Sequence, residues 1–181
     1  MRPEDEVKCI FSYSLRKLDG SLGMFTAGRV VSGNRVPSYK DTIDREDPLR
    51  LTQRVMVRPL LNYLGYDDVF SGDVFNGRVP GASVATVTMN SDLPSAVSRM
   101  LCSMRADDSP KGIATDGFRW LLAEKDEWYN GKVKNVVDLR PYYVETLELI
   151  RFRGACPRDE RDLREFIDVF GNDRRHIHKY P

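Results

Sequence analysis

The alternation of apolar and polar positions is clearest between Gly81 and Leu122. A β-branched run at 83–89 predicts a buried strand, and polar residues 90–92 are suited to cap a helix after it. The apolar positions that follow recur at helical spacing, which predicts a helix with one core-facing side: Val97, Met100, Leu101 and Met104. A second apolar run at 112–115 and the Asp116-Gly117 pair then predict a hairpin into a strand at 118–122.

The flanking segments predict further elements around this centre. Residues 8–15 and 22–31 read as two strands joined by a turn at 18–21, which predicts an N-terminal β-hairpin extension. This hairpin either extends the main sheet or serves as an arm in assembly, because two strands alone are marginally stable. We expect the remaining elements in this order: a charged linker at 40–48, a helix at 49–64 kinked by Pro59, a strand at 67–75, a returning strand at 132–139, and helices at 138–150 and 158–170.

Together these elements predict an α/β (α+β) protein with a mixed central sheet flanked by helices. We divide the chain into a β-hairpin extension and linker at 1–46, an α/β core at 47–153, and a C-terminal helix with a basic tail at 154–181. The amphipathic helix at 158–170 carries a core-type apolar stripe: Leu163, Phe166, Ile167 and Phe170.

Net charge, hydropathy and cysteine content disfavour several classes of protein but do not indicate a function. The 181 residues carry a formal net charge of +1, so no whole-protein charge favours nucleic acid. No apolar run approaches the ~20 residues of a membrane span, and the charged N-terminus lacks the apolar core of a signal peptide. Three dispersed cysteines favour neither a disulfide framework nor a zinc site, so we expect a cytoplasmic protein without a membrane partner.

Two stretches resemble a known family. The phrase GIATDGFRWLL at 112–122, and the segment at 51–74 with its LGY turn, are similar to the N-terminal nuclease-like domain of type I restriction enzyme motor subunits. That domain is a branch of the PD-(D/E)XK nucleases, and the resemblance covers roughly 52–152. It implies a restriction-endonuclease-like fold for the core segment at 47–153.

The resemblance also implies an active site that this sequence does not reproduce. The family uses an Asp and an acidic-x-Lys pair to hold a divalent metal and activate water. By alignment, the acidic-x-Lys positions fall on Thr88 and Asn90, and the upstream Asp falls near Ser83. The Gln and Tyr that the family often carries in the next helix fall at Arg99 and Ser103. The resemblance therefore implies a nuclease-like fold without catalytic residues, metal ligands or cofactor.

Other chemistry finds little support in the sequence. A displaced Mg²⁺ site would draw on Asp67, Asp73 or Asp92 and would make the protein an active nuclease. His176 and His178 share one side of an extended tail, but no Cys or carboxylate constellation accompanies them. The sequence contains no phosphate-binding glycine loop and no nucleophile elbow.

Basic and amide side chains near the nuclease-like core are the candidate contacts to nucleic acid phosphates. The predicted set is Gln53, Arg54, Arg58, Arg78, Arg99, Arg119 and Arg140, with Arg105 and Lys111 as further cations. Our leading hypothesis is a non-catalytic protein that associates with DNA or RNA inside a larger assembly. An interaction or structural subunit of a viral or defence complex is the first alternative, and the displaced-site nuclease is the second. We expect a protein partner under either of the first two hypotheses.

Overall fold

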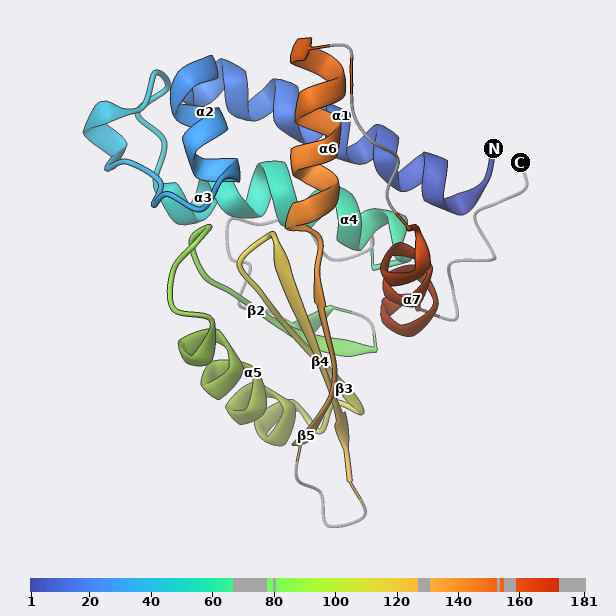
Figure 1. The fold of residues 1–181 in the computed structure, drawn as a ribbon. Coiled ribbons are helices and arrows are strands. Elements are labelled where there is room, and N and C mark those ends of the chain that lie inside the picture. Colours follow the sequence, from blue (N-terminus) through green and yellow to red (C-terminus); the bar gives the residue numbers. More distant parts are fainter. Residues whose placement is uncertain (67–77, 80, 127–130, 153, 155–158, 173–181) are drawn as a thin grey trace.

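A five-stranded mixed sheet lies at the centre of the computed structural model (Figure 1). The structure describes residues 1–66, 78–79, 81–126, 131–152, 154 and 159–172. The strands follow one another across the sheet in chain order: β1 (Arg78–Val79), β2 (Ala82–Thr86), β3 (Lys111–Thr115), β4 (Arg119–Lys125) and β5 (Gly131–Asp138). The protein is thus a mixed α+β protein, as the sequence predicts.

Among the strands that the structure describes, one pair is parallel. β2 and β3 run in the same direction, with Val84 opposite Ile113 and Thr86 opposite Thr115. The crossover between them is α5 (Leu93–Asp107), because parallel neighbours need a long connection. The other pairs, β1–β2, β3–β4 and β4–β5, are antiparallel. The hairpins after Thr115 and before β5 confirm the strand order predicted for 112–139.

The two faces of the sheet have different covers, and Figure 1 shows α5 alone on one of them. Under α5 lies a small apolar cluster in which Met100 and Met104 meet Ala85, Ala114 and others. Gly112 allows this close approach, since a Cβ there would stand 2.4 Å from the Met104 sulfur. The α5 face is therefore closed by small strand residues beneath long, adaptable methionines.

On the other side α7 (Arg161–Phe170) lies beside the sheet, and the remaining helices form a helical layer beyond the end of the strands (Figure 1): α1 (Pro3–Leu22), α2 (Met24–Val31), α4 (Arg58–Tyr63) and α6 (Arg140–Phe152). On α7, all four residues of the predicted stripe are buried, and Phe166 lies edge-on to Trp120 of β4 at 5.2 Å between ring centroids. The same apolar core contains Phe11 from segment 1–46, Trp120 from segment 47–153 and Phe166 from segment 154–181. The three predicted segments therefore share one apolar interior. The division at residues 46 and 153 stays a prediction.

The predicted N-terminal β-hairpin is wrong, because both of its strands are helices. Residues 8–15 lie within α1, and residues 22–31 fall on the end of α1 and on α2. The buried positions recur with the helical period rather than alternating: Val7, Phe11, Leu15, Leu18 and Leu22. Pro3 opens α1 with three acidic residues in its first turn, which is a typical helix start. The break falls at Gly23, where φ is 79°, and not at the predicted turn.

The helix predicted at 49–64 is present but interrupted. It consists of α3 (Pro48–Thr52), a π-helical turn η2 (Gln53–Val57) and α4, and a short 3-10 turn η1 (Tyr39–Asp41) precedes it. The π turn comes directly before Pro59, which has no N–H to continue the regular pattern. Gly65 ends α4 with φ at 90°, as predicted. The strand predicted at 67–75 lies outside the described residues.

Two substitutions distinguish the helical N-terminus from a hairpin. In a strand, Phe11 and Tyr13 would share a face, whereas in α1 Phe11 is buried and Tyr13 is 51% exposed. We predict that Phe11→Ala lowers the free energy of unfolding by about 3–5 kcal/mol. Tyr13→Ala should change it by no more than about 0.5 kcal/mol. Urea unfolding of both variants checks this, and equal losses would contradict a helix here.

Candidate functional site

Polar side chains gather at the carboxyl ends of β2 and β3, where the only parallel pair in the sheet ends. This position follows from the topology, since the connection to α5 leaves the sheet there as loop 87–92. In open sheets with parallel strands, ligands bind preferentially at such ends. We therefore take loop 87–92 and the side chains bonded to it as the candidate site.

The loop is held to the helical layer by its backbone and by one asparagine. The Met89 N–H donates to Thr52 Oγ1 at 3.1 Å, and the Val87 N–H donates to the Thr115 carbonyl at 3.0 Å. Asn90 adopts a left-handed backbone with φ at 62°. Its amide Nδ2 donates to the carbonyls of Val30 at 2.8 Å and Asn34 at 2.6 Å. The loop is thus fixed against α2 and the segment after it.

Gln53 reaches the same place from the π-helical turn. Its Nε2 donates to Thr86 Oγ1 at 2.9 Å, and both side chains are buried. A buried amide bonded to a buried hydroxyl is a satisfied core contact. Gln53 therefore positions the end of β2 and does not offer its amide to a phosphate in solvent, contrary to its predicted role.

Arg119 is anchored by an acidic residue. Asp116 is fully buried in the turn between β3 and β4, where its Oδ1 accepts from the backbone N–H groups of Phe118 and Arg119. Its Oδ2 accepts from Arg119 Nε at 2.9 Å and Nη2 at 2.6 Å. The Arg119 Nη2 also donates to the Ser91 carbonyl at 2.9 Å. The charge of Arg119 is neutralised locally, although its side chain is 37% exposed.

Arg140 bonds to the loop, and Arg99 bonds to the end of β2 just before the loop, in both cases through neutral acceptors. Arg99, on an exposed position of α5, donates from Nη2 to the Thr86 carbonyl at 2.7 Å. Arg140, at the start of α6, donates from Nη2 to Asn90 Oδ1 at 2.5 Å and from Nη1 to the Val31 carbonyl at 3.0 Å. Its guanidinium also lies 4.4 Å from the centroid of the Phe118 ring, a cation–π distance.

These contacts leave two cationic charges at the loop without a carboxylate. Among the ion pairs of the described residues, Arg99 and Arg140 take no part. Hydrogen bonds to carbonyl and amide oxygens satisfy donors but leave the positive charge in place. Two guanidinium groups therefore lie at the loop, beside the exposed Asp92 within it, on a chain whose net charge is +1.

The other predicted contacts lie elsewhere. Arg54 pairs with Glu46 at 2.6 Å, and this hydrogen bond raises the pKa of the Arg54 guanidinium. Arg58 is exposed on α4. Arg78 belongs to β1, at the sheet edge farthest from β5. Lys111 begins β3 and Arg105 lies near the end of α5, both away from the carboxyl ends. The structure thus brings together Gln53, Arg99, Arg119 and Arg140 from the predicted set.

The positions aligned with the nuclease motif have local roles. Ser83 Oγ donates to Ser109 Oγ at 2.8 Å in the interior, and the Thr88 carbonyl accepts from Ser91 Oγ at 2.5 Å. Ser103 Oγ donates to Asp107 on α5. Asp92 is exposed before α5, whereas Asp67, Asp73, His176 and His178 lie outside the described residues. In the described ranges, no three His, Cys, Asp or Glu side chains are grouped to hold a metal ion.

Sequence reasoning missed Asp116 and Asn90 as organisers of this site. The sequence predicts only a turn at Asp116-Gly117, and it predicts Asn90 only as a helix cap or as the position of a lost lysine. The signal was present for Asp116, because an Asp before Gly often bonds the backbone two residues on. Asn90 contacts residues 30, 34 and 140, which lie far from it in the sequence. No local sequence pattern predicts such contacts.

Comparisons with known proteins leave the family open. No protein-family model matches the chain, and neither the curated proteins nor the solved structures contain a significant match. None of the helices in the described part of the chain is long and apolar enough to cross a membrane. The fold and site therefore define the class only: a mixed α+β protein with arginines around the loop that leaves its parallel strand pair.

We predict that Asp116→Ala destabilises the protein more than any single arginine change at this loop. It would leave two backbone N–H groups and the Arg119 guanidinium without their acceptor, at a cost of about 2–4 kcal/mol. Asp116→Asn should cost less, because its Oδ1 still accepts the backbone bonds. Denaturant unfolding measures both, and an Asp116→Ala protein within about 0.5 kcal/mol of wild type would contradict the assigned role.

Proposed function

We propose that the protein is a non-catalytic, nucleic-acid-associated protein that contacts the phosphate backbone through loop 87–92. The observation that carries the proposal is a pair of cations at the loop that donate to neutral oxygens. Arg140 bonds to Asn90 within the loop and to the Val31 carbonyl, and Arg99 bonds to the Thr86 carbonyl just before the loop. Guanidinium groups are suited to phosphate because they donate in a planar fork and stay charged at any physiological pH.

The fold proposed for this role is a degenerate restriction-nuclease-like core. Its support is the order of elements: a helix, then β2, the crossover α5 and β3, with the GIATDGFRWLL phrase running from β3 into β4. Thr88 and Asn90 stand where the resemblance expects a carboxylate and a lysine. Asn90 instead accepts from Arg140 and thereby brings a cation to that position.

This exchange suits binding without cleavage. A nuclease places a metal between its carboxylates and the scissile phosphate, so that the metal stabilises the developing charge. A guanidinium can attract the phosphate but does not generate a metal-bound nucleophile. Arg119 contributes geometry rather than net charge, since Asp116 neutralises it. A site built in this way holds the nucleic acid backbone with no preference for sequence.

The test is binding of labelled duplex and single-stranded DNA and RNA at several salt concentrations, with Mg²⁺ present. We predict retention that weakens as salt rises, because bound phosphates release counterions. A denaturing gel of the same samples should show intact substrate. Cut substrate would support the displaced-site nuclease instead, and absence of retention at low salt would contradict nucleic acid binding.

Neutralising substitutions test the site within the same assay. Arg99→Gln and Arg140→Gln should each weaken binding and reduce the slope of log K against log salt by about 0.7–0.9, the value for one phosphate contact. Arg16→Gln is the matched control, because this residue is exposed on α1 and takes part in none of the ion pairs of the described residues. Equal effects of all three changes would indicate general charge attraction and would contradict a site at the loop.

A further inference from the structure

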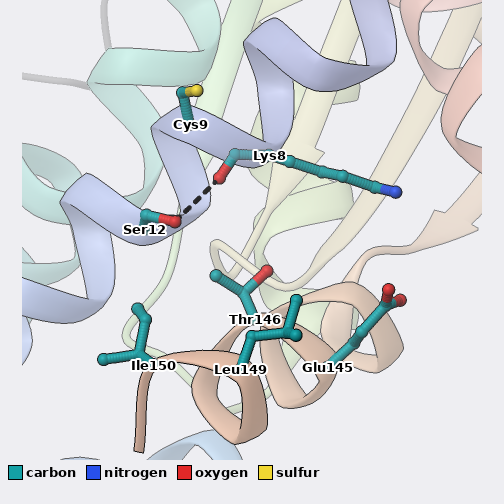
Figure 2. A pocket seen from close by; sticks show the side chains of 7 residues that line it. All are labelled: Lys8, Cys9, Ser12, Glu145, Thr146, Leu149 and Ile150. Carbon is teal, nitrogen blue, oxygen red and sulfur yellow. Dashed lines mark hydrogen bonds between the residues drawn. The ribbon is translucent and has the colours of Figure 1, made fainter. Parts of the chain in front are cut away.

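A cleft between α1 and α6 lies apart from the arginine loop. It has a volume of about 290 Å³ and is lined by Lys8, Cys9, Ser12, Glu145, Thr146, Leu149 and Ile150. Figure 2 shows Lys8 and Glu145 extending toward the same end of the cleft, with Ile150 at the other end. The lining thus combines charged groups at one end with aliphatic side chains at the other.

Glu145 is the unusual member of this lining. The residue is only 7% exposed, and its Oε2 is buried without a hydrogen-bond partner among the described residues. A carboxylate removed from water normally requires a donor or a counter-ion. Lys8, the cation that lines the cleft, is not the counter-ion of Glu145, because its Nζ bonds to Glu160 at 2.6 Å. The second oxygen of Glu160 accepts from Arg2 at 3.3 Å, so Glu160 is well engaged with both cations.

The aliphatic end of the cleft continues onto an exposed surface of α6. Leu149 is 49% exposed, Ile150 38% and the nearby Phe152 77%. The cleft itself is slightly smaller than the ~300–1,000 Å³ of usual small-molecule sites. Its size and composition suit one long side chain with an apolar stem and a cationic head. The exposed apolar surface beside it suits the flanking residues of a polypeptide.

From these observations we propose that the α1–α6 cleft binds an arginine side chain presented by a partner protein. The guanidinium donates to the Glu145 carboxylate, its methylene stem lies against Leu149 and Ile150, and apolar neighbours of the arginine cover the surface toward Phe152. Arginine is enriched among residues that dominate interface energies, and desolvated charge pairs of this kind lose much affinity when one member is neutralised. The inference does not depend on nucleic acid binding.

Ligand binding in the cleft can be measured by protection of Cys9 from alkylation, with Cys102 as the internal reference. Cys9 is an exposed free thiol that lines the cleft, and Cys102 is an exposed free thiol on α5, across the sheet. A ligand in the cleft should slow alkylation of Cys9 by iodoacetamide and leave Cys102 unchanged. The rates are read at each cysteine by peptide mass spectrometry, in the intact chain.

The probes are two acetylated, amidated tripeptides, Leu-Arg-Leu and Leu-citrulline-Leu, which differ only in the charge of the central side chain. We predict that the arginine peptide protects Cys9 at concentrations at least tenfold lower than the citrulline peptide, as expected for a charge-assisted hydrogen bond. Butylguanidinium, which has the head and stem without flanks, should protect less well than the arginine peptide. Equal protection by butylguanidinium would overturn the assignment to a partner protein, and equal protection by the citrulline peptide would overturn the role of Glu145.

Glu145→Gln is the decisive variant, because it keeps the shape of the side chain and removes its charge. We predict at least a tenfold loss of protection by the arginine peptide, together with a midpoint of urea unfolding that is unchanged or higher. The increase follows because the variant removes a buried charge that has no partner. A lower midpoint would show that Glu145 has a structural counter-ion, and this result would overturn the proposal. If no probe protects Cys9 or Cys102 from alkylation, the proposal is also overturned.

Discussion

The buried ion pair between Asp116 and Arg119 is the interaction on which the arrangement of the candidate site depends. Asp116 is inaccessible to solvent, and its carboxylate accepts from two neighbouring residues, Phe118 and Arg119, where the chain enters β4. The turn therefore forms as a unit, and its cation reaches across to the Ser91 carbonyl of loop 87–92. Because a buried carboxylate without donors is costly, the turn and the loop are fixed together.

The arginines around this loop differ in whether their charge is paired with a carboxylate. Arg119 is neutralised by Asp116, whereas Arg99 and Arg140 reach the loop through carbonyl and amide oxygens. We therefore propose a positioning role for Arg119 and a binding role for Arg99 and Arg140. The proposal needs only these local cations, since the net charge of the chain is +1.

The sheet and the central helix were predictable because their signals are local. The β-branched run before loop 87–92, the methionines of α5 and the Asp116-Gly117 turn each determine an element within a few residues. The stripe of α7 was predictable for the same reason, and Phe166 and Ile167 are buried as expected. The N-terminal segment was misjudged because a short alternation around Phe11 and Tyr13 outweighed the longer helical period from Val7 to Leu22.

The site was predictable only in part. A search for basic residues found Arg99, Arg119 and Arg140, but it could not distinguish them from Arg54, whose charge is paired with Glu46. Such pairing depends on contacts that the fold creates and that a sequence pattern does not show. The same holds for the buried Oε2 of Glu145, which has no hydrogen-bond partner among the described residues. A sequence pattern records residue types, whereas function here depends on which charges the fold leaves unpaired.

We propose that loop 87–92 binds nucleic acid phosphates through Arg99 and Arg140. The salt dependence of nucleic acid binding, measured for the wild type and for the double variant Arg99→Gln/Arg140→Gln, tests this. We expect the slope of log K against log salt to fall by about 1.4–1.8 in the double variant, the value for two phosphate contacts. An unchanged slope, or a wild type that binds no nucleic acid at low salt, would contradict it.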